Sequence, residues 1–430
     1  MSRLSSLNPA HAHDSSPPCQ GPVDNSETGH LPGDFSTSAH AVPTDVSAGA
    51  VAQPARKRVL FIINSLAGGG AERVICTLLR ASQGELRDSR ISLLLLDREA
   101  AMYEVPRWIE VQQLDCRHSL VRSIWSVWRA LRRAQPDLTV SFLTRSNVAN
   151  IIAGVLLGIP SVISERVNTS SHLGSGAGAM VARLLVKATY PKARRIIAVS
   201  QGVADDLHAS FGVRSERMAV IANPIDLDAI RAQADSGTPV PIDGPYAVTM
   251  GRLVPNKNFG MLIEAFARSG IAGRLLILGD GPDRDALTRK VEALGLADRV
   301  VMPGFSANPF PTLARADFYI SPSNAEGFPN SLLEAMSVGL PVISTNCPSG
   351  PSEVLADLKR EQVGPGVTFA PHGILVAPND PDAMAEALRA MADPARRHGY
   401  AERAPKRAAD FGVARAKDAY WAVIREAAAA

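Results

Sequence analysis

Cysteine is scarce in this sequence, and its scarcity excludes several kinds of protein. Only four cysteines occur in 430 residues, and none forms a C-x-x-C pair. A disulfide-stabilised scaffold and a cysteine-based zinc site both need closer or paired spacings. The scattered pattern is typical of a protein that folds in a reducing compartment such as the cytosol. The four residues are Cys19, Cys76, Cys116 and Cys347.

Long hydrophobic runs are also missing. The longest one, residues 148–163, is interrupted by Gly154, Gly158 and Pro160. It falls short of the roughly 20 residues that a helix needs to cross a bilayer. The first residues lack the apolar core of a secretory signal. We therefore expect no membrane-spanning helix and a cytoplasmic location.

The net charge is small, but the charges are unevenly distributed. The chain carries 45 Lys and Arg against 42 Asp and Glu, which gives +3. Residues 1–55 hold 1 basic and 5 acidic residues (−4), residues 56–222 hold 23 and 13 (+10), and residues 223–430 hold 21 and 24 (−3). A basic segment in a nearly neutral chain indicates an anionic partner for that segment.

Residues 1–55 differ in composition from the rest of the chain. They are rich in serine and proline and contain few large apolar side chains. Such a segment cannot bury enough surface to offset its ordering entropy. We predict a disordered tail over residues 1–55, with folded structure beginning abruptly after it.

From residue 58 onward, short apolar segments alternate with segments of helix length. The apolar segments lack polar alternation, which is typical of parallel strands covered by helices on both faces. The sequence therefore predicts an α/β protein with two Rossmann-like, doubly wound parallel-sheet domains that face each other across a cleft. The predicted strands are residues 58–63, 91–96, 138–142, 161–164 and 195–199 in the first series, and 246–250, 274–278, 299–302, 318–320, 341–344 and 373–376 in the second.

A break between the two series predicts a hinge. Asn223-Pro-Ile-Asp226 and a stretch rich in Ser, Gly and Pro separate the last strand of one series from the first strand of the next. Ligands of such folds bind beyond the carboxyl ends of the strands, so the cleft is the expected site. The predicted parts are an N-terminal domain at residues 56–222, a hinge at 223–245, a C-terminal domain at 246–412 and a C-terminal helix at 413–430.

A glycine-rich loop, Gly68-Gly69-Gly70, follows the first strand and precedes a helix. Glycine lets a ligand approach the backbone, and a helix N-terminus attracts phosphate. Arg73 stands where G-x-G-x-x-G has its third glycine, and the GK[ST] of a P-loop is absent. Nicotinamide binding and P-loop hydrolysis are therefore disfavoured. The loop is either a phosphate-facing turn or an ordinary strand-to-helix turn.

Two cations follow the first strand of the second series. Arg252 comes after Gly251 at the strand end, and Lys257 lies five residues further on. At the carboxyl edge of a parallel sheet, an arginine fork and a lysine can together hold a diphosphate. From this fragment alone, a solvated pair of charges is the alternative.

The most specific pattern is a pair of glutamates in Glu326-Gly-Phe-Pro-Asn-Ser-Leu-Leu-Glu334. Glu326 is predicted in the loop after a strand, and Glu334 about one turn into the next helix, which Asn330 or Ser331 would cap. Ionised carboxylates in one crevice can accept hydrogen bonds from vicinal hydroxyls, while the helix N-terminus offers donors to phosphate. Alternatively, both acids only stabilise the start of the helix.

Residues 117–133 carry five arginines and no acid, with apolar residues at helical spacing. They indicate an amphipathic helix, which either packs on its own sheet as a surface helix or lies on anionic lipid. A second basic cluster at residues 183–195 would suit a polyprenyl-diphosphate acceptor. Nucleic-acid binding is not expected, because no reader motif accompanies the charge.

Taken in order, these motifs resemble the retaining glycosyltransferases of family 4, which have the GT-B fold. The resemblance covers residues 56–430 and is strongest across 246–355. Two of the motifs are similar to a subgroup that builds bacterial surface polysaccharides, namely Gly68–Arg73 and Ile163–Arg166. The others are Glu326-x7-Glu334, Gly251-Arg252 with Lys257, Asn223-Pro-Ile-Asp226 and Ser349-Gly-Pro-Ser-Glu353.

The resemblance implies roles for the matching residues. Arg252 and Lys257 would hold the donor diphosphate and stabilise its departure. Glu326 would contact the transferred sugar, and Glu334 the ribose hydroxyls. Transfer in this family needs no metal, so no cofactor is implied. Gly69, Gly70, Gly327, Phe328, Pro329, Asn330 and Ser331 would complete the donor site.

On the acceptor side, the resemblance suggests Glu165 and Arg166 at a strand end that faces the cleft. The fold analogy also places the C-terminal helix against the N-terminal domain. The implied partners are a nucleotide-sugar donor, a lipid-linked glycan acceptor and an anionic membrane surface bound by the basic N-terminal domain.

The expected function is that of a retaining hexosyl- or N-acetylhexosaminyltransferase, more typical of UDP- than GDP-sugars. It would act at the inner face of the cytoplasmic membrane, in exopolysaccharide, capsule or O-antigen synthesis. Two alternatives remain. An epimerase or phosphorylase on a similar scaffold would need an acid/base set or a pyridoxal lysine, and neither is evident. A non-catalytic nucleotide-sugar-binding component of an assembly complex would not need the intact pair Glu326 and Glu334.

Overall fold

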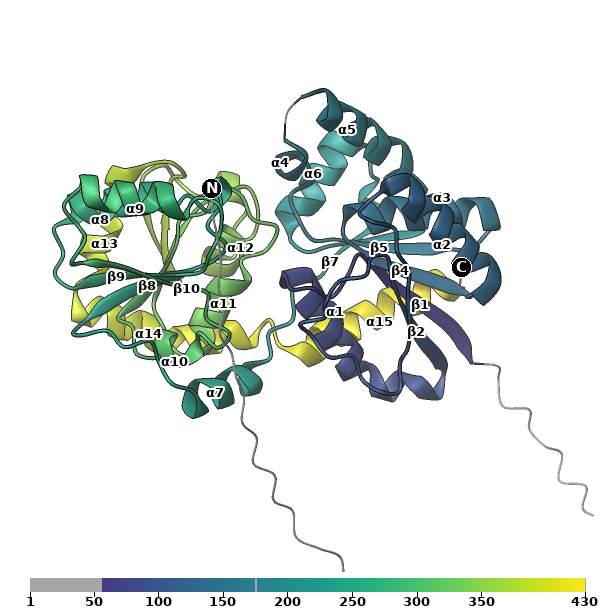
Figure 1. Ribbon diagram of the computed structural model, residues 1–430, viewed down its shortest axis with the longest axis horizontal. Helices are drawn as coiled ribbons and strands as arrows, with labels where there is room; N and C mark the ends of the chain where they lie inside the picture. Colours follow the sequence, from purple (N-terminus) through teal and green to yellow (C-terminus); the bar gives the residue numbers. More distant parts are fainter. Residues whose placement is uncertain (1–55, 175, 430) are drawn as a thin grey trace, which may run out of the picture. The chain divides into compact units, whose positions relative to one another are not determined.

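The computed structural model describes residues 56–174 and 176–429. The predicted tail, residues 1–55, lies outside the described residues. Two seven-stranded sheets, each flanked by helices, make up the described chain (Figure 1). We call residues 56–222 together with the last helix the N lobe, and residues 223–412 the C lobe.

The N-lobe sheet has the strand order β3-β2-β1-β4-β5-β6-β7, and every neighbouring pair is parallel. Alternate residues of β1 enter different cores, because Phe61 and Ile63 pack on one face while Leu60 and Ile62 pack on the other. Both faces are therefore covered, as the unbroken apolar runs predict. The strands are β1 (Lys57–Ile63), β2 (Ser89–Leu95), β3 (Glu110–Gln113), β4 (Leu138–Phe142), β5 (Ser161–Glu165), β6 (Arg195–Ala198) and β7 (Met218–Val220).

Seven α-helices belong to the described part of the N lobe. Helix α2 begins at Leu120 with Ser119 as its N-cap and buries Val127 and Leu131, so the predicted amphipathic helix is present. The last helix of the chain crosses back into this lobe, where Tyr420 and Trp421 are buried against the sheet. The helices are α1 (Gly70–Ala81), α2 (Leu120–Ala134), α3 (Thr144–Leu157), α4 (Thr169–Leu173), α5 (Ala177–Thr189), α6 (Gln201–Phe211) and α15 (Val413–Ala429).

The C-lobe sheet has the order β10-β9-β8-β11-β12-β14-β13. Its strands are parallel except at one edge, where β13 runs antiparallel to β14. Every strand that the sequence predicted in this lobe pairs in parallel, and β13, which it did not predict, is an antiparallel addition that needs no helical crossover. The strands are β8 (Tyr246–Met250), β9 (Arg274–Leu278), β10 (Val300–Gly304), β11 (Phe318–Ser321), β12 (Val342–Thr345), β13 (Val367–Ala370) and β14 (Gly373–Val376).

Helices cover both faces of the C-lobe sheet. On one face α8 and α13 pack together over buried Phe266 and Leu388, and on the other α11 contributes Leu332 and Leu333. The helices are α7 (Leu227–Ser236), α8 (Phe259–Ser269), α9 (Arg284–Ala293), α10 (Phe310–Leu313), α11 (Asn330–Ser337), α12 (Pro351–Ala356), α13 (Pro381–Met391) and α14 (Pro394–Ala409).

The chain passes between the lobes twice, and the two crossings touch. Ile225 on the first crossing forms an isolated β-bridge with Gly412 on the second, and its backbone N–H donates to the Phe411 carbonyl at 2.8 Å. The segment 223–245 is not irregular throughout, because it contains α7, which packs on α10 and α11 of the C lobe.

Candidate active site

The motif residues of the C lobe gather at the carboxyl edge of its sheet. Gly251 and Arg252 follow β8, and Glu326 lies in the loop after β11. Because β8 and β11 are parallel neighbours, these loops leave the sheet side by side. The sequence placed these residues at one edge, and the structure brings them together there.

Lys257 and Glu326 form an ion pair at this edge. Lys257 ends a short 3-10 helix, Pro255–Lys257, and its Nζ lies 2.6 Å from Oε1 of Glu326. Burial lowers the pKa of Lys257, but the Glu326 carboxylate more than offsets this, so the net shift is upward. The ammonium is therefore a permanent positive charge in the site, already oriented by one carboxylate.

Arg252 follows Gly251 at the same sheet edge, and its side chain is exposed. Within the described residues its guanidinium has no hydrogen-bond or ion-pair partner among protein groups. An arginine fork without a protein partner, next to an oriented lysine, suits a doubly charged diphosphate.

Glu334 is the more deeply buried of the two glutamates, with 4% of its surface exposed. It lies one turn into α11, as its spacing predicts. The predicted cap by Asn330 or Ser331 is wrong, because Pro329 is the N-cap residue and the helix has no side-chain cap. Asn330 is instead the first helical residue, and its Oδ1 accepts a hydrogen bond from Asn223 Nδ2 at 2.5 Å.

The partner of Glu334 comes from the other lobe. Arg73, in the first turn of α1, directs its guanidinium Nη1 to Oε1 of Glu334. Burial raises the pKa of the Glu334 carboxyl, and the arginine offsets only part of that rise. The carboxylate in turn raises the pKa of Arg73. The ion pair joins α1, which follows the glycine loop of the N lobe, to α11 of the C lobe.

Close backbone approaches surround this ion pair. A Cβ on Gly70 would lie 2.7 Å from Nδ2 of Asn330, and a Cβ on Gly327 would lie 2.0 Å from the carbonyl oxygen of Arg166. The Arg166 oxygen belongs to the backbone, so only glycine fits at position 327, whereas at position 70 the Asn330 side chain has to shift to accept a Cβ. Gly69 precedes α1 as its N-cap residue. The N-terminal ends of α1 and α11 therefore meet, and both favour negative charge.

Glu165 and Arg166 lie deeper than their predicted acceptor role requires. Glu165 is fully buried and accepts hydrogen bonds from the hydroxyl of Tyr190 and from the backbone N–H of Arg166. Burial raises the pKa of its carboxyl. Arg166 is 6% exposed and donates to Tyr420 Oη at 2.6 Å and to Asn223. The charged groups of both side chains are therefore already hydrogen-bonded to other protein groups near the junction of the two lobes.

A second contact between the lobes involves Glu353, which the sequence placed in a motif without a role. Its Oε2 and Oε1 accept hydrogen bonds from the backbone N–H groups of Gln201 at 2.7 Å and Gly202 at 3.0 Å. These groups begin α6, so the carboxylate neutralises a helix N-terminus. Ser200 donates to the carbonyl of Gly327 at 2.9 Å beside it. In the sequence, this contact was marked only by the position of Glu353 in the motif Ser349-Gly-Pro-Ser-Glu353.

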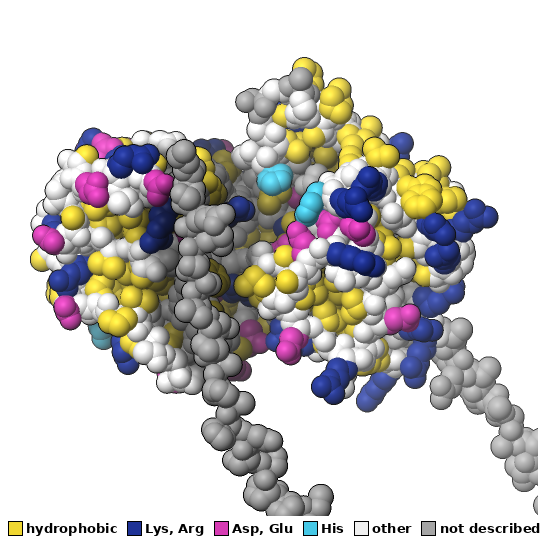
Figure 2. All heavy atoms as spheres, viewed as in Figure 1, with side chains coloured by type: hydrophobic (Ala, Val, Ile, Leu, Met, Phe, Trp, Pro, Cys, Tyr) yellow, Lys and Arg dark blue, Asp and Glu magenta, His cyan; other side chains and the backbone are white. Residues whose placement is uncertain are grey.

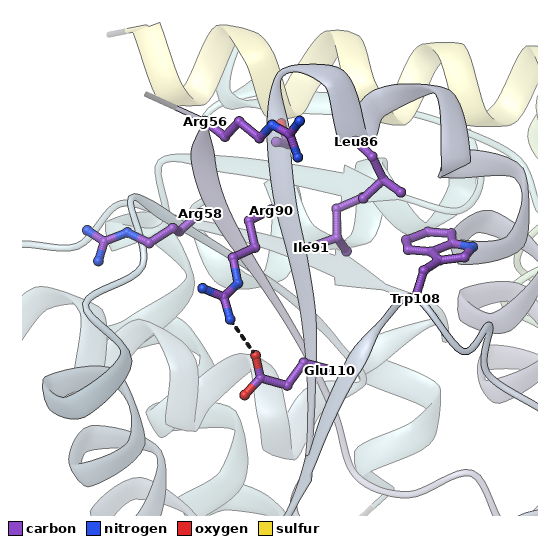
Figure 3. Close-up of a pocket in the computed structure, with 8 residues that line it drawn as sticks. Arg56, Arg58, Leu86, Arg90, Ile91, Trp108 and Glu110 are labelled. Carbon is purple, nitrogen blue, oxygen red and sulfur yellow. Dashed lines mark hydrogen bonds and ion pairs between the residues drawn. The ribbon is translucent and has the colours of Figure 1, made fainter. Parts of the chain in front are cut away.

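A cavity of about 560 Å³ lies away from these residues, at the amino ends of β1, β2 and β3 (Figure 3). Its arginines are mostly paired, since Arg90 contacts Glu110 at 2.9 Å and Arg58 contacts Asp137 at 3.3 Å. Ligands of parallel sheets bind at the opposite, carboxyl edge. The carboxyl edge, which carries Glu326 and Glu334, is therefore the candidate active site.

Residues 56–174 and 176–429 contain neither a metal-binding cluster nor a membrane-spanning helix. No group of three or more His, Cys, Asp or Glu side chains in these ranges is arranged to hold a metal ion. None of their helices combines the length and the apolar character needed to cross a membrane.

Family models match both lobes. Residues 68–229 match the model described as Glycosyltransferase Family 4, and residues 233–407 match that described as Glycosyl transferases group 1. The chain belongs to the family 4 glycosyltransferases. The first match includes the glycine loop and Arg73, and the second includes Arg252, Glu326 and Glu334, so both halves of the site lie in matched segments.

Two relatives of this glycosyltransferase come from Campylobacter jejuni. N-acetylgalactosamine-N,N'-diacetylbacillosaminyl-diphospho-undecaprenol 4-alpha-N-acetylgalactosaminyltransferase is 28% identical over 364 residues, which is 82% of this chain and 94% of the relative. GalNAc-alpha-(1->4)-GalNAc-alpha-(1->3)-diNAcBac-PP-undecaprenol alpha-1,4-N-acetyl-D-galactosaminyltransferase is 24% identical, with 86% and 98% coverage.

Solved structures share the fold. HepE of Anabaena in complex with UDP gives a TM-score of 0.66 at 21% identity, covering 86% of this chain and all of that one. The lipopolysaccharide outer core galactosyltransferase WaaB in its apo form gives 0.64 at 21% identity, with 86% and 99% coverage. The fold of this glycosyltransferase is therefore GT-B, with two α/β lobes.

Proposed function

We propose that this glycosyltransferase moves a hexosyl or N-acetylhexosaminyl unit from a UDP-sugar to a lipid-linked glycan intermediate, with retention of anomeric configuration. The observation that carries the proposal is the convergence of Arg252, Lys257, Glu326 and Glu334 at one sheet edge, opposite the glycine loop. The names of the Campylobacter relatives specify diphospho-undecaprenol acceptors, and the Anabaena structure contains UDP. Both support these assignments.

The diphosphate of the donor would bind between the cations and the helix ends. Arg252 supplies a planar fork, Lys257 a point charge, and the N-terminus of α11 the backbone N–H of Ser331. Charge on the leaving diphosphate grows during transfer, so fixed positive groups stabilise the transition state more than the bound donor. These groups can act without a metal ion, and we propose that none is required.

The two carboxylates would bind the neutral ends of the donor. Glu334 would accept hydrogen bonds from the ribose diol, and Glu326 would contact the hydroxyls of the transferred sugar. Phe328 and Pro329 are buried beneath this loop and hold Gly327 in place against the N lobe. The site thereby recognises both the nucleotide and the sugar.

The transfer step requires no group beyond donor, acceptor and these residues. The bond from the anomeric carbon to the diphosphate oxygen breaks, and the electron pair leaves with the diphosphate. The acceptor hydroxyl oxygen bonds to the anomeric carbon on the same face, and its proton passes to the departing phosphate oxygen. The positive charge of Arg252 and Lys257 stabilises that departure.

Binding of nucleotides tests the donor site. Thermal shift with UDP, GDP and a set of their sugars should raise the melting temperature with UDP compounds. Arg252→Ala should weaken UDP binding by about tenfold through loss of a charge-assisted contact. Arg289→Ala, an exposed residue on α9, is the matched control. No shift with any nucleotide sugar would reject the donor site.

We also propose that the N lobe binds the inner face of the cytoplasmic membrane as a peripheral protein. Helices α2, α3 and α5 are neighbours in space, and none of them contains an acidic residue. Seven of the fourteen large hydrophobic residues that the described chain exposes lie on these three helices, each 55–77% exposed. We call them the three-helix face: Val121, Trp125, Val155, Leu156, Met180, Val181 and Leu184.

Basic residues accompany the three-helix face. Exposed Arg122, Arg129 and Arg133 lie on α2, and Arg183 and Lys187 on α5. Hydrophobic side chains gather over α3 and α5, with lysine and arginine around α2 (Figure 2). An apolar surface with only positive charges is complementary to an anionic bilayer, where Trp125 would lie at the headgroup level.

Sedimentation with vesicles tests this face. We expect binding to vesicles that contain phosphatidylglycerol, weakened by salt, and little binding to pure phosphatidylcholine. Trp125→Ser with Leu184→Ser should reduce binding, whereas Leu294→Ser and Phe305→Ser on the C lobe should not. Equal sedimentation with neutral and anionic vesicles would reject the proposal while leaving the donor site intact.

A further inference from the structure

We infer that Arg73 changes partners when the donor binds: its guanidinium separates from Glu334 and pairs with the donor diphosphate. This exchange makes the site select nucleoside diphosphates over nucleosides. The inference rests on the proposed function, because it assumes that the ribose binds Glu334. It adds a charged side chain of the N lobe to a donor site whose other charged side chains come from the C lobe.

Glu334 is buried and paired with Arg73. Its side chain is 6% exposed, and Arg73 is the one partner that its carboxylate has within residues 56–174 and 176–429. A buried carboxylate without a partner is strongly unfavourable. Arg73 therefore supplies the neutralising charge at the position where a ribose diol would have to bind.

A ribose that binds Glu334 would displace the guanidinium of Arg73 from the carboxylate. Two hydroxyl groups can donate to both oxygens of Glu334, but they carry no charge. Ribose binding consequently replaces a charged partner of Glu334 by neutral donors. A nucleoside alone would separate the ion pair and leave the guanidinium without an anion.

The displaced side chain of Arg73 stays near the proposed position of the diphosphate. Its side chain is 47% exposed, so it has room to move, and it stands one turn above Gly70 at the N-terminus of α1. Gly70 touches Asn330 at the N-terminus of α11, where the diphosphate is proposed to bind. A displaced guanidinium thus remains beside two phosphate groups, with which it can form bidentate hydrogen bonds.

The exchange has an opposite effect on two ligands. Uridine must break the ion pair without compensation, whereas UDP replaces the lost carboxylate with a phosphate partner. Removing the guanidinium should therefore help uridine and harm UDP. A purely structural role for Arg73 would weaken both ligands together.

Calorimetric titration of the full chain with uridine and with UDP tests the exchange. For Arg73→Ala we expect uridine to bind several-fold more tightly and UDP about tenfold more weakly, the size typical of a charge-assisted phosphate contact. Arg73→Gln, which keeps a hydrogen-bonding side chain but no charge, should change both affinities in the same two directions. Arg80→Ala, an exposed arginine in the last turn of α1, should change neither.

The outcomes separate this inference from the proposed function. If UDP binds the parent protein and Arg73→Ala shifts uridine and UDP in the same direction, or shifts neither, the exchange is wrong while the donor site stands. If neither UDP nor GDP binds the parent protein, the donor site and the exchange fail together. If Arg73→Ala does not fold, the same two criteria apply to Arg73→Gln.

Discussion

Two buried glutamates, one in each lobe, are stabilised in opposite ways. Glu165 of the N lobe is surrounded by hydrogen-bond donors of its own lobe, which include Tyr190, Asn147 and the backbone of Arg166. Glu334 of the C lobe has its charged partner, Arg73, in the other lobe. The first carboxylate belongs to a complete polar cluster, whereas the second depends on how the lobes meet.

The difference separates a structural acid from a binding acid. A cluster whose donors come from one lobe keeps its partners whenever that lobe is folded. A carboxylate whose partner arrives from elsewhere can exchange that partner for a ligand without unfolding anything. Buried charge alone therefore does not identify the functional residue, but the origin of its partner does.

The largest effect expected from this comparison is the loss of stability on removing Glu165. Glu165→Ala leaves the buried Tyr190 hydroxyl without its acceptor and opens a cavity, and we expect a loss of about 3 kcal/mol. All four tryptophans, at residues 108, 125, 128 and 421, lie in the N lobe, so tryptophan fluorescence during urea unfolding reports on that lobe. Glu110→Ala, exposed on β3, is the control, and a loss below about 1 kcal/mol would contradict the structural role.

The second-largest effect is expected at Glu334, where substitution should weaken ligand binding but leave the stability nearly unchanged. Glu334→Gln should weaken UDP binding by about 100-fold, because the amide has one accepting oxygen in place of two and carries no charge. The tryptophan-monitored unfolding of the N lobe should stay within about 1 kcal/mol of the parent. Isothermal titration and urea unfolding measure the two quantities, with Glu292→Gln on α9 as the control. Unchanged UDP affinity would remove Glu334 from the site.

A smaller effect is expected at the ion pair of Lys257 and Glu326, which lies wholly within the C lobe. Lys257→Met should lower kcat by roughly 30-fold through loss of leaving-group stabilisation, with a smaller change in KM. Lys257→Arg should restore part of the rate. Steady-state kinetics with a UDP-sugar measure both constants, and an unchanged kcat would show that Lys257 only orients the loop.

The smallest effect is the pH dependence of the N-lobe cluster. Burial raises the pKa of Glu165 above 4.5 in the folded protein, so the folded state binds its proton more tightly than the unfolded state. The contribution to stability is full below pH 4.5 and decreases as the pH rises through the folded pKa. Glu165→Gln should therefore flatten the fall of the unfolding midpoint above pH 4.5. Parallel profiles for parent and variant would argue against a raised pKa.

The sequence predicted most of the sheet strands because their faces are covered. Central strands such as β4 and β8 are almost wholly buried and have the predicted bounds. Three edge strands escaped prediction. β3 has all four residues exposed, β7 has three residues, and β13 is an antiparallel addition, so none carries an apolar run of sufficient length.

The site was predictable to the extent that it is local. Arg252, Lys257, Glu326 and Glu334 each follow a strand of one sheet, which fixes their shared edge. The contact of Glu334 with Arg73 spans 261 positions of sequence and depends on packing between lobes, which no local pattern encodes. The acceptor role suggested for Glu165 and Arg166 stays a prediction, although their burial favours a structural one.

The Glu353 contact connects the two lobes independently of the proposed donor site. Its carboxylate is fastened to the start of α6 by two backbone donors, and the chain crossings are fastened by the bridge of Ile225 with Gly412. Neither fastening includes a residue proposed to bind the donor. Both contacts lie outside the ion pair of Arg73 with Glu334, so separating that pair leaves two other connections between the lobes in place.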